Sequence, residues 1–96
     1  MMKRYSILQK EKECIVCGCH YNLHTHEVFY GNNRRRSIKD GCCVYLCGRH
    51  HNLSDEGVHF DHKLDLALKK KMQRRWMEYY EKDVADFIKE YGRNYL

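Results

Sequence analysis

The chain contains no proline, no low-complexity tract and no internal repeat. Nothing in it therefore predicts a disordered linker, except for the polar residues at its N-terminus. It also lacks an apolar run long enough to span a bilayer, and residues 1–10 do not resemble a signal peptide. We expect a cytoplasmic protein that does not enter a membrane, in which the six cysteines stay reduced rather than forming the three disulfides of a secreted domain.

The length of the chain bounds its architecture. With 96 residues, it has room for one domain but not for two. A core of this size is barely sufficient to fold alone, so a structural metal is expected on physical grounds. We predict one domain over residues 1–96, with its core at residues 14–60 and a C-terminal helical extension at residues 61–96.

Two pairs of residues have the spacing of zinc ligands. They are the C-x-x-C pair Cys14 and Cys17, and the C-x-x-H pair Cys47 and His50. Each pair lets one tight turn supply two ligands, and a structural zinc ion takes four in a tetrahedron. We therefore predict a zinc site built from these four residues. Cys42 or Cys43 remains an alternative to a ligand of the second pair.

The histidines are concentrated in one part of the chain. All seven lie between His20 and His62, so enough remain for a second metal after one of them completes the zinc site. Residues 23–30 alternate in the manner of a short strand, which places His24 and His26 on the same face. A second metal held by such histidines would serve chemistry rather than folding.

The rest of the pattern predicts further short elements and two helices. The short elements are a helical turn or loop at residues 34–39, a strand at residues 43–46, and a helical turn or loop at residues 51–57. Apolar residues recur about every four positions over residues 64–80, which predicts an amphipathic helix. After a break, residues 84–91 are expected to form a last helix that Gly92 caps.

The charge balance is basic. The chain has 18 Lys+Arg against 13 Asp+Glu, a net charge of +5, and its densest basic run is Arg34, Arg35 and Arg36, followed by Lys39. Such a run is typical of contacts to nucleic-acid phosphates, which supply affinity with little sequence information. A modest positive excess is equally consistent with a solvated surface.

The order of these motifs resembles the HNH family of nucleases. The shared order is C-x-x-C, a strand ending in a histidine, a basic segment, and L-C-x-x-H-H-N, over about residues 14–60. Its most specific parts are L-H-T-H-E-V-F at residues 23–29 and L-C-G-R-H-H-N at residues 46–52. The chain also resembles the small HNH-type proteins of phages and prophages. The resemblance implies an α+β fold, a small zinc-stabilised ββα-metal domain followed by C-terminal helices.

The resemblance also implies catalytic roles. Carried over to this chain, His26 falls at the position of the general base, at the end of the first strand. His51 falls at the position of a metal ligand at the start of the family's α-helix, and His59 is the nearest second ligand. The ion at such a site would be Mg²⁺, Mn²⁺ or another divalent cation.

The chain departs from the family pattern at three positions. Where the family usually has Asp or His directly before the base, this chain has Thr25, so His24 is expected to supply the ligand instead. The family's central asparagine would fall near Cys42, which leaves Asn33 as the candidate for its role. The fourth zinc ligand, usually Cys, is His50 here, and zinc accepts either residue.

We predict a metal-dependent DNA endonuclease that hydrolyses phosphodiester bonds. A neutral histidine suits the deprotonation of the attacking water, and a divalent cation polarises the phosphoryl group. The alternative is a non-catalytic zinc-dependent module that binds nucleic acid or another protein. Thr25 and the missing central asparagine keep that alternative open.

Overall fold

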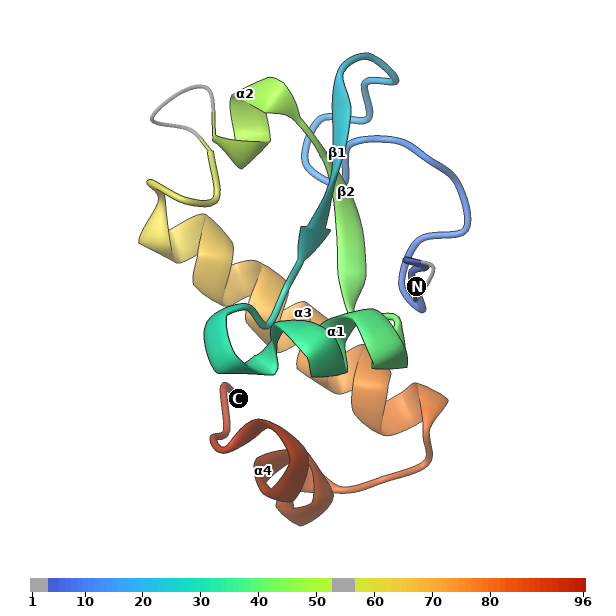
Figure 1. Ribbon diagram of the computed structural model, residues 1–96, viewed down its shortest axis with the longest axis vertical. Helices are drawn as coiled ribbons and strands as arrows, with labels where there is room; N and C mark the ends of the chain where they lie inside the picture. The colour runs from blue at the N-terminus through green and yellow to red at the C-terminus, as the bar shows by residue number, and fades with distance from the viewer. Residues whose placement is uncertain (1–3, 53–56) are drawn as a thin grey trace.

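The computed structural model describes residues 4–52 and 57–96 and has an α+β architecture with a two-stranded sheet, as predicted (Figure 1). Its elements in chain order are the strand β1 (Leu23–Glu27), the 3-10 turn η1 (Gly31–Asn33), the helix α1 (Arg34–Asp40), the strand β2 (Cys43–Cys47), and the helices α2 (Gly48–His51), α3 (His62–Tyr79) and α4 (Val84–Tyr91). None of the helices in the described ranges is long and apolar enough to cross a membrane.

β1 and β2 form an antiparallel hairpin. Its register sets His24 opposite Leu46, so the start of β1 lies beside the end of β2 that leads into α2. The connection between the strands crosses the far end of the hairpin as η1 and α1 (Figure 1). Ser37 fixes this crossing, because its hydroxyl donates to the Phe29 carbonyl at 2.6 Å and accepts from the Phe29 N–H at 3.1 Å.

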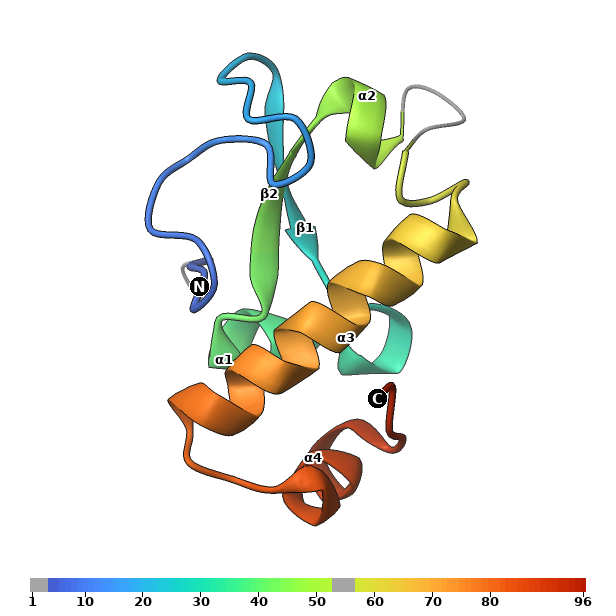
Figure 2. The ribbon, with the colours of Figure 1, turned by 180° about the vertical axis from the view of Figure 1, so that it is seen from behind.

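The helix α3 runs diagonally past the hairpin and α1 (Figure 2). Leu68, Met72 and Trp76 are buried on the apolar stripe that the sequence predicts. α4 adds Phe87, whose ring centroid lies 5.2 Å from that of Phe29 and 5.3 Å from that of Trp76. Each buried side chain of this kind stabilises the fold by about 1.5–3 kcal/mol, so the cluster ties both helices to the hairpin connection.

Side chains mark the ends of both C-terminal helices. Asp61 caps the start of α3, since its carboxylate accepts from the N–H groups of Lys63 and Leu64. Asp83 and Asp86 form a reciprocal capping box at the start of α4. Such caps contribute about 1 kcal/mol each. Gly92, at φ 85°, ends α4 and donates from its N–H to the Ile88 carbonyl at 2.7 Å. The predicted break before the last helix and the predicted Gly92 cap are therefore confirmed.

The boundaries of the first strand and of the basic segment differ from those predicted. β1 ends at Glu27 rather than at residue 30, because the chain turns into η1 at Gly31, where φ is 69°. Residues 34–39, for which we expected a helical turn or loop, lie within the α-helix α1.

The helix after the second strand also begins earlier than the family pattern implies. β2 extends to Cys47, α2 starts at Gly48, and His51 is its last residue rather than its first. A helical turn within the C-x-x-H pair allows Cys47 and His50 to face one point. Residues 53–56, part of the turn or loop expected at residues 51–57, lie outside the described residues.

Candidate functional site

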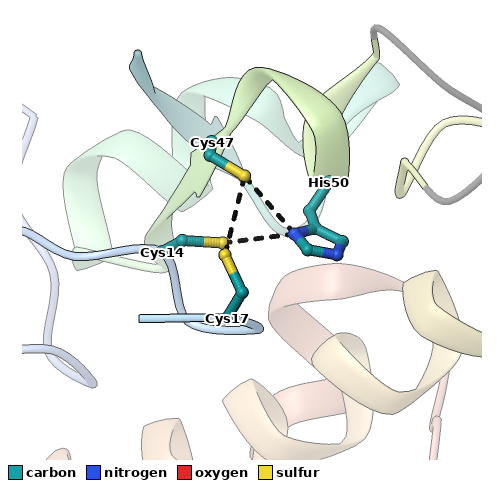
Figure 3. Close-up of side chains that lie close together, drawn as sticks. All are labelled: Cys14, Cys17, Cys47 and His50. Carbon is teal, nitrogen blue, oxygen red and sulfur yellow. Dashed lines mark hydrogen bonds between the residues drawn. The ribbon is translucent and has the colours of Figure 1, made fainter. Parts of the chain in front are cut away.

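The first of two clusters, which we call the cysteine site, brings the predicted zinc ligands together. It consists of Cys14, Cys17, Cys47 and His50, whose ligand atoms all lie within 4.8 Å of one another. The first two come from an N-terminal turn, and the other two come from the end of β2 and from α2 (Figure 3). Gly18, at φ 76°, lets that turn close, and its N–H donates to the Cys14 carbonyl at 2.8 Å.

The spacing of the cysteine site fits a tetrahedral ion. Ligand arms of about 2.3 Å to sulfur and 2.0–2.1 Å to nitrogen give tetrahedron edges of about 3.8 Å between sulfurs and about 3.5 Å from sulfur to nitrogen. The Cys17 and Cys47 sulfurs are 3.8 Å apart. His50 Nδ1 lies 3.3 Å from the Cys47 sulfur and 3.7 Å from that of Cys14. The cluster is therefore compatible with zinc.

The pKa values of two thiols in the cysteine site are shifted in opposite directions. Burial raises the pKa of Cys14, but the N–H groups of Cys47, Cys17 and Val16 outweigh it and lower that pKa to about 6. The N–H of Cys19 lowers the pKa of Cys17, but desolvation and the neighbouring thiols raise it to about 11. Backbone amides thus stabilise the thiolate of Cys14, whereas the neighbouring thiols disfavour the thiolate of Cys17. A bound cation would stabilise the thiolate of Cys17 and so lower its pKa.

The second cluster, which we call the histidine site, consists of His26, His51 and His59. One nitrogen of each ring belongs to a group of atoms within 4.8 Å of one another. The ring centroid of His26 lies 5.3 Å from that of His51 and 5.3 Å from that of His59. Nε2 of His51 is 3.1 Å from Nε2 of His59. β1, α2 and the segment before α3 thus each contribute one imidazole.

His24 stands beside this cluster. Its Nδ1 lies 2.8 Å from Nδ1 of His51, and its Nε2 lies 3.3 Å from Oδ1 of Asn22. His24 and His26 both face His51, as the predicted alternation of the strand requires. His24 therefore contacts the nitrogen of His51 opposite to the one that faces His59. Such a partner fixes the orientation of a ligating imidazole.

Burial favours the neutral form of His26 and of His51. His26 is 3% exposed, and burial together with the charges of His51 and His59 lowers its pKa to about 4. Burial, His59 and His24 also lower the pKa of His51. Nε2 of His26 is buried without a hydrogen-bond partner among the described residues. A neutral imidazole nitrogen without a partner, such as Nε2 of His26, can serve as a metal ligand, and the proximity of the three rings would let them share one ion.

Some of the basic residues predicted to contact nucleic acid form ion pairs with acidic residues of the chain. Arg34 lies 3.2 Å from Glu27, and Arg36 lies 3.7 Å from Glu90. Arg35 and Lys39 form no ion pair within residues 4–52 and 57–96.

The remaining alternatives have other contacts. Cys42 and Cys43 are buried away from the cysteine site, and burial raises the pKa of each to about 12. Asn33 donates from Nδ2 to the Tyr91 carbonyl at 3.0 Å and accepts from Arg36 at 3.3 Å. Its observed contacts thus anchor α4.

Two acidic residues near the histidine site were not anticipated. Glu27 accepts from Arg4 at 2.9 Å and from Arg34 at 3.2 Å. Asp65 is buried on α3, where it accepts from Tyr30 and Lys69. A signal for Asp65 was present, because a charged residue three positions before Leu68 falls on the apolar stripe of the helix.

The two sites offer distinct chemistry. The cysteine site presents three sulfurs and one nitrogen, a donor set of structural zinc sites. The histidine site presents three imidazoles, a group that could hold a metal ion through nitrogen alone. In comparisons with known proteins, no family model, no curated protein and no solved structure matches the chain.

Proposed function

We propose that this chain is a small zinc-stabilised nuclease of the HNH type that hydrolyses phosphodiester bonds in DNA with a divalent cation. The observation that carries the proposal is the convergence of His26, His51 and His59, in which His51 directly follows His50 of the cysteine site on α2. The order β1, β2, α2 that delivers the first two histidines agrees with the ββα-metal arrangement implied by the motifs.

The cysteine site is assigned a structural role. Zinc there would join the N-terminal turn to β2 and α2, and so hold the backbone that carries His51. Four-coordinate sites of this kind leave no position for substrate. The second ion would therefore bind elsewhere.

The histidine site is assigned the chemistry. His51 and His59 would hold the divalent cation, with His24 fixing the ring of His51 from its other nitrogen. When bound, the cation supplies Lewis-acid polarisation of the phosphoryl oxygen. His26, neutral at physiological pH, would accept the proton of the attacking water.

DNA binding is assigned to the basic face beside the hairpin. Arg35 and Lys39 are exposed and belong to the segment that crosses the end of β1. Arg34 adds a guanidinium that Glu27 holds in position. Contacts of this kind recognise the phosphate backbone rather than bases, so we propose little sequence preference.

The experiment is plasmid nicking by the zinc-loaded protein with Mn²⁺ or Mg²⁺. We expect nicked product that EDTA abolishes, and loss of product in His51→Ala. His62→Ala is the matched control, because His62 is an exposed histidine at the start of α3. Absence of metal-dependent nicking in every preparation would overturn the proposal.

One observation favours a second function, a DNA-binding module without catalysis. Asn33, the candidate for the family's central asparagine, is bonded to the Tyr91 carbonyl. Zinc-dependent DNA binding without nicking is the result that this alternative predicts.

A further inference from the structure

Asp65 is a carboxylate buried in the core next to the histidine site. It is 8% exposed, and its Oδ2 accepts from the Tyr30 hydroxyl at 3.1 Å and from the Lys69 ammonium at 2.8 Å. Its other oxygen, Oδ1, is buried and has no hydrogen-bond partner among the described residues. A buried polar atom without a partner is costly, so a ligand that supplies the missing partner is favoured.

Within the described part of the chain, His26 Nε2 is the other buried side-chain atom without a hydrogen bond. Tyr30 links the two residues. Its ring centroid lies 6.0 Å from that of His26 and 6.1 Å from that of His59, and its hydroxyl donates to Asp65. Burial lowers the pKa of His26, and the charge of Asp65 opposes this lowering, so the two groups interact electrostatically. Tyr30 and this charge interaction therefore place Asp65 and His26 near one another.

The donor set of the histidine site explains why a carboxylate would matter there. Neutral imidazoles bring no negative charge to a divalent cation, and Mg²⁺ and Mn²⁺ favour carboxylate and water over imidazole alone. The oxygens of Asp65 fall outside the group of ligand atoms within 4.8 Å of one another. Asp65 would thus reach an ion through a bridging water molecule rather than directly.

We infer that Asp65 completes the histidine site as its anionic group, accepting a hydrogen bond from a water molecule that bridges it to a Mn²⁺- or Mg²⁺-type ion. The inference rests on the proposed function, because it requires a divalent cation at the histidine site. Lys69 is the counter-charge of Asp65, and its positive charge opposes binding of the cation. Removing Asp65 and removing Lys69 should therefore have opposite effects.

The test is Mn²⁺ affinity of the zinc-loaded protein, measured by calorimetric titration and by electron paramagnetic resonance of the free ion. We expect Asp65→Asn to bind Mn²⁺ about tenfold more weakly, as for other residues that support metal ligands. Lys69→Met keeps the aliphatic stem but removes the ammonium, which lies 4.2 Å from the Tyr30 ring centroid. It should bind Mn²⁺ several-fold more tightly, on the order expected for one nearby charge.

Lys71→Met is the matched control, because Lys71 is an exposed lysine on the same helix as Lys69. It should bind Mn²⁺ as the wild-type protein does. A merely structural role for the Asp65–Lys69 pair predicts that both charge variants weaken binding together. That result, or unchanged affinity in Asp65→Asn, would overturn the inference.

Folding of each variant is checked by zinc content and circular dichroism. If Asp65→Asn does not fold, Lys69→Met decides, and Mn²⁺ binding no tighter than wild type overturns the inference. Wild-type protein that binds no Mn²⁺ would instead contradict the proposed function. The two failures are therefore distinguishable.

Discussion

His50 and His51 are consecutive residues of α2, yet their side chains lie in two different clusters. His50 Nδ1 is 3.3 Å from the Cys47 sulfur, whereas His51 Nε2 is 3.1 Å from His59 Nε2. Consecutive residues of a helix point about 100° apart, so one turn can serve both sites. One helical turn therefore carries a residue of each cluster.

Removal of zinc should abolish Mn²⁺ binding at the histidine site, because α2 would lose the anchor that orients His51. The measurement is Mn²⁺ titration before and after treatment with a zinc chelator that is then dialysed away. Adding zinc back should restore the binding. Equal Mn²⁺ affinity with and without zinc would show that the two sites are independent.

Purified protein should contain about one tightly held zinc per chain, since structural sites contribute folding free energy directly. Cys17→Ala should lose the zinc and the cooperative thermal transition. Cys19→Ala is the control, because the Cys19 sulfur faces the Tyr21 carbonyl at 3.6 Å and is no member of the cysteine site. A metal-free protein with the thermal transition of the zinc form would refute the assignment.

Local spacing explains what could be predicted from the sequence. The pair Cys14 and Cys17, and the pair Cys47 and His50, each fit within one turn, so their convergence required only that the two turns meet. The period of two in the first strand likewise sets His24 and His26 on the side that faces His51. Periods and short spacings are properties of the chain that folding preserves.

Long-range packing explains what could not be predicted. The roles of Asn33 and Asp65 depend on Tyr91 and Tyr30, which lie 58 and 35 positions away in the chain. The start of α2 was predicted at residue 51, but the helical turn begins at Gly48, inside the C-x-x-H pair. Helix propensity does not predict this start, because the requirement that Cys47 and His50 face the same point comes from the tertiary structure.

Replacing both Arg35 and Lys39 with Ala should weaken DNA binding similarly across sequences. Each lost phosphate contact lowers the slope of log affinity against log salt by about 0.9, so the double variant should lose about 2. A charge-matched control is Lys10→Ala with Arg93→Ala, since Lys10 and Arg93 are exposed outside the basic run. Unchanged DNA affinity and salt slope in the Arg35/Lys39 variant would show that the basic run is an ordinary solvated surface.

Glu27 should stabilise the fold in a pH-dependent manner. Burial raises its pKa, but hydrogen bonds from Arg4 and Arg34 outweigh burial and hold that pKa below its ordinary value of 4.5. As pH falls, Glu27 is therefore protonated in the unfolded chain before it is protonated in the folded chain. The stabilisation is present above the ordinary pKa and is lost as pH falls through the pKa of the folded state.

Urea denaturation of wild type and Glu27→Gln measures this contribution as a difference in the free energy of unfolding. We expect about 1 kcal/mol or less at neutral pH, since both arginines are partly exposed, and a decline toward zero in acid. A difference that stays constant or grows as pH falls would contradict the role of the ion pairs.

Single-turnover cleavage of DNA by His26→Ala with Mn²⁺ tests whether His26 is the general base. The variant should keep its fold, its zinc and Mn²⁺ binding through His51 and His59, but cleave about 100- to 10,000-fold more slowly. Its residual rate should rise with pH as hydroxide replaces the missing base. A folded His26→Ala protein that cleaves at the wild-type rate would contradict the assignment of His26 as the general base.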